Sequence, residues 1–323
     1  MEMLEEISTA FAQDIEENCP FQEDASPSSS LSEEEENIED DDEETLPVIE
    51  MQANNGGVLG ENLTAASPGK SGTVGGPYPS SEMKSEPQRD TARTLNQAHV
   101  HVPASPTEKV EEASLPYTVA AHHLIPGNAA LKTSSLYEFL KKDGKVKSQA
   151  GNEWKISAFA GYNVNGCHNG VWLPGSYAIR AGTSVMKDTW SVLRGRVPVW
   201  CMNYAAAVTK VADGQFHDTH VTYSEKVQER LDDLATLLFK HLDVCKACKG
   251  KKELPPPYRV KASLYAISET LKGKVKARPE AWKGPWFTSD KLKEIIMKGG
   301  KLDQDFKSAY EAARIAPPKR SAS

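Results

Sequence analysis

Two adjacent histidines stand in the run Ala121-His122-His123-Leu124-Ile125-Pro126, where a short apolar stretch ends at a proline. Neighbouring side chains of a strand point to opposite faces, so one imidazole can bind a metal while the other faces a substrate. The pattern therefore predicts two roles, that of a metal ligand and that of a group that moves a proton. The alternative is a histidine pair in a surface loop.

A second pair, His217 and His220, stands just before a long helix. That helix is predicted to reach about His241, because apolar residues recur with a 3.6-residue period at Val227, Leu231, Leu234, Leu238 and Leu242. A spacing of three residues at a helix start lets both imidazoles converge on one point. A role in the core or in capping the helix is the alternative.

Three further stretches must position these histidines. A short strand is predicted over residues 118–125, which carries the first histidine pair, and a helix over residues 198–212. Between them, residues 161–174 are dense in turn-forming residues and then become apolar. This change predicts a fixed polar turn that lies against the core.

The C-terminal part of the chain, residues 253–323, carries several helical patterns. Helices are predicted near residues 260–271, 289–298 and 303–315. Basic residues lie among the aromatic residues Trp282, Trp286 and Phe287. Such a combination can hold a nucleic-acid backbone, but packing of these aromatic side chains on the rest of the protein is favoured.

Charge is divided between two parts of the chain. Residues 1–115 hold 26 acidic and 5 basic residues, a net charge of −21, whereas residues 116–323 hold 33 basic and 19 acidic residues, a net charge of +14. A basic globular part suits a polyanionic partner, most simply nucleic acid, through counterion release and long-range steering. A soluble basic domain without such a partner is the alternative.

Residues 1–115 are predicted to be mostly disordered. Serine-rich or acidic blocks, such as residues 26–30, 33–36 and 39–44, bury too little apolar surface to order the chain. One short amphipathic helix is expected at the start, from the spacing of Leu4, Ile7, Phe11 and Ile15. We expect this region to solubilise the protein. The alternatives are an acidic cover over the basic domain and a loading signal for a secretion machine or a chaperone.

The five cysteines are Cys19, Cys167, Cys201, Cys245 and Cys248. This sparse and odd-numbered set fits a reducing compartment and no disulfide framework. Cys245 and Cys248 form an isolated Cys-x-x-Cys. A structural zinc normally needs four ligands, and Cys167 or Cys201 would complete one only if the fold brought them there. We therefore expect structural roles for both cysteines of the motif.

The start of the chain lacks the basic region and the apolar run of a secretory signal peptide. No apolar stretch approaches the roughly 20 residues that cross a bilayer. We therefore expect a protein made in the cytoplasm that has no membrane partner. The sequence contains no Walker loop, GxGxxG or Gly-x-Ser-x-Gly motif, which argues against the chemistries of those loops.

In chain order, the predicted elements are a His-His strand, an Asn-Gly turn and a helix whose start carries His-x-x-His. The chain resembles the AHH family of the HNH/endonuclease VII superfamily, the ββα-metal nucleases found as toxin domains of bacterial polymorphic and type VI secretion effectors. Three stretches carry the resemblance: residues 121–126, the run from Asn169 to Pro174, and the run from His217 to Tyr223. It covers roughly residues 116–243.

The resemblance implies a role for each of four residues. His122 is expected to ligate one divalent metal ion. His123 is expected to act as the general base, since a free imidazole has a pKa of about 6.5 and can accept a proton from water. Asn169 is expected to orient the loop that holds the base without reacting. His220 is the preferred second ligand, and His217 is the next.

The three-residue spacing of His217 and His220 is shorter than the His-x-x-x-His of colicin-type HNH nucleases, so the ligand pair stays open. Asp218 is an alternative ligand, and Tyr223 completes the matching His-x-x-Tyr pattern. His168 could touch a phosphate, although a position on the surface is favoured for it. An imidazole-rich site suits Zn, Ni or Mn, whereas an aspartate ligand favours Mg.

Together these features predict an α+β protein in three parts: a disordered acidic N-terminal region (1–115), a ββα-metal nuclease core (116–252) and a small, mainly helical C-terminal region (253–323). The predicted function is metal-dependent hydrolysis of phosphodiester bonds in DNA. The protein would be a toxin made in a bacterial cytoplasm, delivered into a rival cell and neutralised by an immunity protein. The alternatives are a nucleic-acid-binding protein with an HNH-like fold that no longer cuts, and a ribonuclease toxin with the same site.

Deletion of residues 1–115 is expected to tighten DNA binding at low salt and to change it little at high salt, because screening removes the competition between the acidic region and DNA. Titration of labelled DNA with the full and shortened chains at both salt concentrations measures the effect. Equal affinities at low salt would exclude autoinhibition and leave this region a role in solubility or delivery.

Overall fold

The computed structural model describes residues 2–22, 55–65, 99–148, 150–176, 179 and 190–313. These residues form two compact units. The first unit draws on residues 1–54, 125–164 and 227–267, and the second on residues 55–124, 165–226 and 268–323. Two helices, α7 (Val221–Val244) and α8 (Val260–Val275), contribute to both units. The mixture of helices and short sheets is the α+β class that the sequence predicts.

The second unit is organised around two paired strands. Strand β3, Val119–His123, pairs antiparallel with β6, Gly170–Pro174. The register sets His122 opposite Val171 and His123 opposite Gly170. Because side chains alternate along a strand, the two histidines leave β3 on opposite faces.

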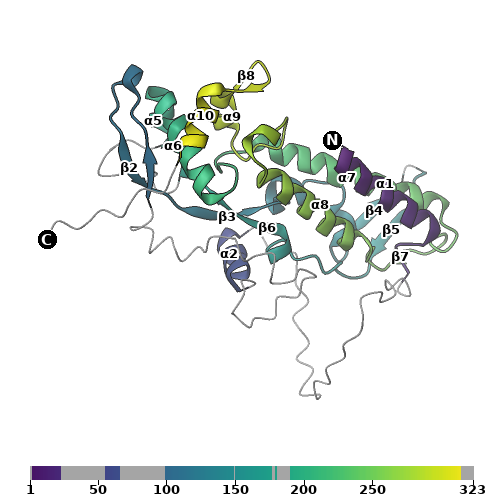
Figure 1. Ribbon diagram of the computed structural model, residues 1–323. Coiled ribbons are helices and arrows are strands. Elements are labelled where there is room, and N and C mark those ends of the chain that lie inside the picture. The colour runs from purple at the N-terminus through teal and green to yellow at the C-terminus, as the bar shows by residue number, and fades with distance from the viewer. Residues whose placement is uncertain are drawn as a thin grey trace, which may run out of the picture. The chain divides into compact units, whose positions relative to one another are not determined.

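Helix α2, Gly56–Ala65, covers one face of this strand pair (Figure 1). Its residues Leu59 and Leu63 are fully buried and belong to one apolar cluster with Ala121. A Cβ atom at Gly170 would lie only 2.7 Å from Cδ1 of Leu59. The glycine therefore allows α2 to lie directly on the backbone of β6.

The described residues of the second unit form further helices, strand pairs and 3-10 turns. The helices are α5 (Trp190–Arg196), α6 (Pro198–Ala212), α9 (Asp290–Ile296) and α10 (Gln304–Ala312). The strand pairs are β1 (His99–Val102) with β2 (Ala113–Pro116) and β8 (Met297–Lys298) with β9 (Lys301–Leu302), and the turns are Pro106–Glu108, Cys167–Asn169 and Pro279–Ala281. Helix α6 packs against β1 and α10. Its first backbone N–H groups, those of Val199 and Trp200, donate to the carboxylate of Glu108 at 2.7 and 2.8 Å. A carboxylate at this end of a helix satisfies unpaired donors and complements the helix dipole.

The last two helices of this unit have side-chain caps. The Ser289 hydroxyl accepts the N–H of Leu292 at 3.0 Å at the start of α9, and the Asp303 carboxylate caps α10. Between α8 and α9, the aromatic residues Trp282, Trp286 and Phe287 are buried. The expectation that these residues pack on the rest of the protein is confirmed.

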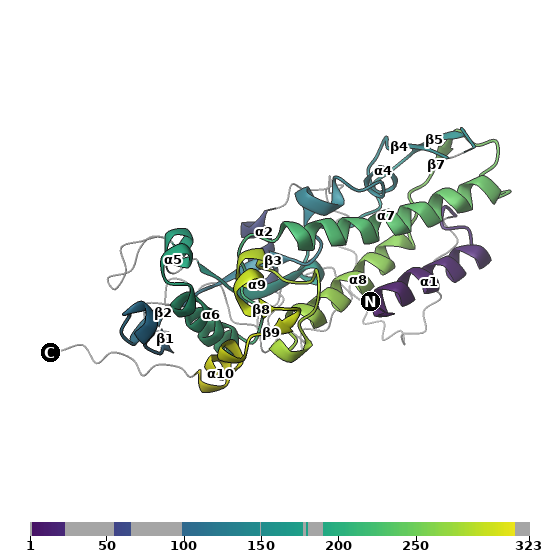
Figure 2. The same cartoon turned by 90° about the horizontal axis from the view of Figure 1, so that it is seen from above.

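The first unit contains a three-stranded sheet and the greater part of α7. Its other elements are α1 (Glu2–Glu17), a π-helical turn (Gly127–Leu131), α4 (Tyr137–Leu140), β4 (Lys145–Lys147), β5 (Glu153–Ile156) and β7 (Glu253–Leu254). Strand β5 pairs antiparallel with β4 and parallel with β7. Helix α1 lies alongside α8 in both views (Figures 1 and 2), and its Phe11 and Ile15 are buried.

Several sequence-based expectations can be compared with these elements. The predicted strand over 118–125 is β3, and the predicted helix over 198–212 is α6 with the same bounds. The apolar stripe of α7, namely Val227, Leu231, Leu234, Leu238 and Leu242, is buried as predicted, and the helix ends at Val244. No helix in the described part of the chain is long and apolar enough to span a bilayer.

The N-terminal region expected to be mostly disordered contains α1, α2 and β1. The blocks at 26–30, 33–36 and 39–44 lie outside the described residues. The region boundaries at 115/116 and 252/253 stay predictions. Because deletion of residues 1–115 also removes α2 and β1, replacement of the acidic residues in 33–44 by their amides isolates the electrostatic effect of the tail more cleanly.

The packing of α2 predicts a stability effect. Leu59→Ala removes a fully buried side chain from the face of β3 and β6 and is expected to lower the free energy of unfolding by about 2–5 kcal/mol. Glu61→Ala, on the exposed side of the same helix, is the matched control and should stay within about 0.5 kcal/mol of the parent. Urea unfolding of the full chain compares them, and equal stability of all three proteins would contradict the packing of α2 on this sheet.

Candidate active site

His122 belongs to a triangle of three imidazoles, with His217 and His220 at the other two corners. Its ring centroid is 4.8 Å from that of His217 and 5.0 Å from that of His220, and the last two are 5.1 Å apart. Each histidine offers one nitrogen, and these three nitrogen atoms all lie within 4.8 Å of one another. The structure therefore brings both predicted histidine pairs together and gives His217 and His220 equal places beside His122.

The backbone fixes the segment that carries His217 and His220. The N–H of His217 donates to the carbonyl of Pro174, at the end of β6, at 2.7 Å. Thr219 accepts the N–H of Asp290 at 2.8 Å, which ties the segment to the start of α9. The hydroxyl of Ser224 lies 3.3 Å from Nδ1 of His220 and leaves Nε2 of that ring for a ligand role.

The protonation states of this group suit metal binding. Burial lowers the pKa of His122 well below its ordinary value of 6.5, and the neighbouring His217 and His220 lower it further. Burial also lowers the pKa of His220. Both rings are therefore neutral near pH 7, and neutral imidazole is the form that coordinates metals.

A buried atom without a partner provides the test of fit. Nε2 of His122 is buried and has no hydrogen-bond partner among the described residues. A buried polar atom in that state costs about 1–3 kcal/mol, which a coordinate bond to a cation would relieve. This atom, together with the nitrogens of His217 and His220, fits a single divalent transition-metal ion.

His123, on the opposite face of β3, makes a hydrogen bond that defines its tautomer. Its Nε2 lies 2.9 Å from Oδ1 of Asn165, and the backbone N–H of Asn55 donates to the same Oδ1 at 3.0 Å. Since a backbone N–H can only donate, this atom of Asn165 is the amide oxygen, and the His123 ring must donate to it. Nδ1 of the neutral ring therefore carries a lone pair that can accept a proton.

The environment keeps His123 neutral. Burial lowers the pKa of His123, and the hydrogen bond to Asn165 acts in the opposite direction. A neutral imidazole with Nδ1 unprotonated is the state that a general base needs before it reacts. The expectation that His123 is the base is thus chemically consistent with its surroundings, and it stays a prediction.

The position of Asn165 depends on α2. The side chain of Asn62 donates to the carbonyl of Asn165 at 2.7 Å, while Asn55 caps α2 by accepting the N–H of Gly57 at 2.9 Å. Helix α2 and Asn55, which belong to the N-terminal region, therefore hold Asn165 in the position from which it orients the His123 ring. Neither Asn165 nor α2 was singled out from the sequence. The available signal was the turn-forming Asn165-Gly166 pair in front of the Asn169 motif.

Asn169 holds the chain directly after the expected base. Its side-chain oxygen accepts the Ser268 hydroxyl at 3.2 Å, and its backbone carbonyl accepts the N–H of Leu124 at 2.9 Å. It therefore fastens the residue that follows His123 to the turn before β6. The side chain that contacts the His123 ring is that of Asn165.

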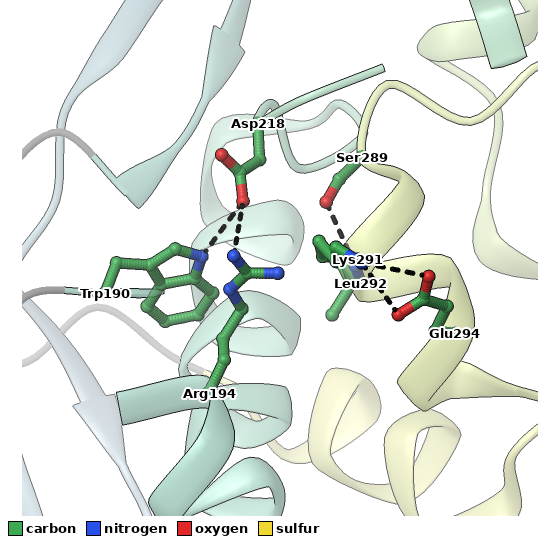
Figure 3. A network of polar contacts seen from close by, with 7 residues as sticks. All are labelled: Trp190, Arg194, Asp218, Ser289, Lys291, Leu292 and Glu294. Atoms are coloured by element: carbon green, nitrogen blue, oxygen red, sulfur yellow. Dashed lines mark hydrogen bonds and ion pairs between the residues drawn. The ribbon is translucent and has the colours of Figure 1, made fainter. Parts of the chain in front are cut away.

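Asp218 does not belong to the three-histidine group, because its carboxylate contacts Trp190 and Arg194. Its Oδ2 accepts the indole N–H of Trp190 at 3.2 Å and lies 3.9 Å from the guanidinium of Arg194 (Figure 3). On the other side of the same view, Ser289 caps α9, and the pair Lys291–Glu294 lies within that helix. The metal-ligand group of this unit consists of three histidines and does not include Asp218.

Tyr223 and His168 occupy buried positions. The hydroxyl of Tyr223 donates to the carbonyl of Leu124 at 2.7 Å, and its ring centroid lies 5.4 Å from that of His122. Burial raises the pKa of Tyr223, so the hydroxyl stays a neutral donor. The favoured surface position of His168 is wrong, because only 6% of this residue is exposed, in the tight turn Cys167–Asn169.

Comparison with known families identifies this region. Residues 105–241 match the family model AHH, described as a nuclease family of the HNH/ENDO VII superfamily with conserved AHH. The match includes Asn165 and all the histidines discussed above. This match supports a nuclease of the HNH/ENDO VII superfamily, a hydrolase that acts on phosphodiester bonds. No curated protein and no solved structure shows significant similarity to the chain.

The hydrogen bond between Asn165 and His123 predicts a graded effect. Asn165→Ala removes the acceptor that fixes the His123 tautomer and is expected to lower the cleavage rate by roughly 10–100-fold, as loss of an orienting partner commonly does. Metal affinity should not change, because Asn165 lies outside the three-histidine group. Asn165→Asp keeps an acceptor oxygen and should recover most of the rate. Single-turnover cleavage and metal titration separate this positioning role from a merely structural one, which would lower both quantities in both variants.

Proposed function

We propose that the protein is a metal-dependent endonuclease that hydrolyses phosphodiester bonds in DNA. His122, His217 and His220 would hold one divalent metal ion, and His123 would be the general base. The observation that carries the proposal is the arrangement around β3, which places a buried three-imidazole group on one face and an imidazole of fixed tautomer on the other.

The residues of the chain divide the work of hydrolysis. Nδ1 of His123 takes a proton from the attacking water, and Asn165 keeps the proton on Nε2 so that Nδ1 is available. Tyr223 and Asn169 hold Leu124 from two sides, which fixes the backbone next to His123. A bound metal ion would stabilise the negative charge that develops on the phosphate and on the departing 3′ oxygen.

The donor set favours a particular group of metals. Three imidazoles suit Zn, Ni or Mn, whereas Mg prefers oxygen ligands. With Asp218 paired to Trp190 and Arg194, the carboxylate that would favour Mg is used elsewhere. We therefore propose that a transition metal supports activity at lower concentration than Mg does.

A nucleic acid is the substrate that the nuclease family implies. The net charge of +14 over residues 116–323 supports binding of a polyanion. We propose duplex DNA as the substrate. Incubation of the full chain with supercoiled plasmid and with total RNA, with and without EDTA, distinguishes the candidates. Plasmid nicking that EDTA abolishes supports the proposal. Cleavage of RNA alone indicates a ribonuclease, and binding without cleavage indicates a protein that has lost the activity.

We further propose that the nuclease is a toxin made in a bacterial cytoplasm and delivered into a rival cell. The resemblance to toxin domains of secreted effectors supports this role, and the N-terminal region is the proposed contact for a secretion component or chaperone. An immunity protein that covers the basic surface would carry acidic residues. Expression of the chain in bacteria should arrest growth, and co-expression of the gene directly downstream should restore it.

Substitution of the histidines separates their roles. His123→Ala is expected to lower the cleavage rate by roughly 100-fold or more, with metal binding intact, because general-base catalysis commonly contributes that much. His122→Ala and His220→Ala should lose metal affinity as well as activity, and added metal should restore part of the rate. His101→Ala, in β1 and outside the three-histidine group, is the matched control and should cut normally.

Calorimetric metal titration beside a plasmid-nicking assay measures both quantities for each variant. Normal cleavage by His123→Ala would exclude the assigned base. Undiminished metal binding by His122→Ala would exclude the assigned ligand group.

A further inference from the structure

The first unit contains a second group of metal-ligating side chains, which shares no residue with the active site. It consists of Cys19, His241, Cys245 and Cys248, each of which offers one ligand atom, and these four atoms all lie within 4.8 Å of one another. We propose that these four residues bind one structural zinc ion. From the sequence, Cys245 and Cys248 were expected to be structural, and Cys167 or Cys201 could complete a zinc site only if the fold brought them there. The fold instead supplies Cys19 and His241.

The distances between the sulfur atoms match a single tetrahedral ion. Sγ of Cys19 lies 3.6 Å from Sγ of Cys248 and 3.5 Å from Sγ of Cys245. Two thiolates bound to one zinc at about 2.3 Å in tetrahedral geometry are about 3.8 Å apart, whereas a disulfide joins its sulfurs at about 2.05 Å. All five cysteines of the chain are free thiols. An iron–sulfur cluster places several iron atoms between its cysteines and needs ligands farther apart.

The last turn of α7 and the residues directly after it supply three of the four ligands. The N–H of Cys245 donates to the carbonyl of His241 at 2.8 Å, so these residues follow one another by a single helical turn and face the same side. The chain then turns, and the N–H of Cys248 donates to the carbonyl of Cys245 at 3.2 Å. The indole of Trp154 donates to the carbonyl of Cys248 at 3.4 Å, which attaches this turn to β5.

Contacts that involve no cysteine place the fourth ligand. Cys19 follows α1, and that helix is held in the first unit by its buried Phe11 and Ile15 and by the ion pair of Asp14 with Arg259. Two residues beyond Cys19, the ring of Phe21 is buried and lies 6.2 Å, between centroids, from that of Phe139. Cys19 therefore reaches the motif because the chain on both sides of it is packed.

Burial and donor chemistry both indicate a cation. Cys248 is 1% exposed, and Nε2 of His241 is a buried atom for which the described residues provide no hydrogen-bond partner. Three thiolates and one imidazole form the Cys₃His set that structural zinc sites commonly use, in which all four positions are taken by protein and none is left for a substrate. The ion would join residue 19 to residues 241–248 and so fasten α1 to the end of α7.

The test uses the full chain, purified under reducing conditions and dialysed against buffer without added metal. About one equivalent of zinc per chain is expected from elemental analysis, since a closed four-ligand site retains its metal. Titration of the thiols with a mercurial reagent should release that zinc, which a colorimetric chelator detects. Replacement of zinc by Co²⁺ should produce thiolate-to-cobalt charge-transfer absorption and the intense visible bands of tetrahedral cobalt.

Variants assign the signal to these residues. Cys19→Ser, and Cys245→Ser combined with Cys248→Ser, should lose the zinc and the charge-transfer absorption. Cys201→Ala, a buried cysteine of α6 outside the group, is the matched control and should keep both. His217→Ala combined with His220→Ala removes two imidazoles of the proposed catalytic centre and should also keep the thiolate bands, so failure of one site is distinguishable from failure of the other.

The wild-type chain alone can overturn the proposal. Absence of bound zinc together with absence of thiolate-to-cobalt absorption would do so. A disulfide between two of the three cysteines, found in protein purified under reducing conditions that takes up no metal, would also do so. Retention of zinc and of the cobalt bands by Cys19→Ser would exclude Cys19 as a ligand and remove the link between α1 and α7.

Discussion

The pairing of β3 with β6 is the constraint on which the active site depends. It fixes two consecutive histidines on opposite faces of one short strand, so that His122 meets His217 and His220 while His123 meets Asn165. A one-residue shift of this register would exchange the two faces. The glycine opposite His123 and the apolar cluster beneath it hold the register, because α2 lies closely against Gly170.

The proposed metal ligand His122 and the proposed base His123 lie in different environments, and each is kept neutral by its own surroundings. Burial and neighbouring rings keep His122 neutral, and its buried Nε2 has no hydrogen-bond partner in the described part of the chain. His123 is prepared by hydrogen bonding, since an amide oxygen that already accepts from the Asn55 backbone can only accept again from the ring. The chain from α2 through Asn165 to His123 makes part of the N-terminal region a component of the nuclease.

Sequence patterns predicted the elements whose signal is local. Strand β3, helix α6 and the apolar stripe of α7 follow from periodicity, and the two histidine pairs were recognisable by type and spacing. The contacts of Asn165, the packing of α2 and the approach of Cys19 to His241 could not be predicted, because they join segments separated by long stretches of chain. Low apolar content predicted disorder over most of residues 1–115, and it concealed α2, whose Leu59 and Leu63 are fully buried by tertiary contacts.

Anomalous X-ray diffraction from crystals of the full chain soaked with Mn²⁺ tests the central claim most directly. The account predicts an anomalous peak within coordinate-bond distance of His122, His217 and His220, with Nε2 of His123 still in hydrogen-bond distance of Oδ1 of Asn165. A peak at Asp218 without one at the three histidines would contradict it. So would the absence of any peak in soaked crystals whose protein, once redissolved, still nicks DNA.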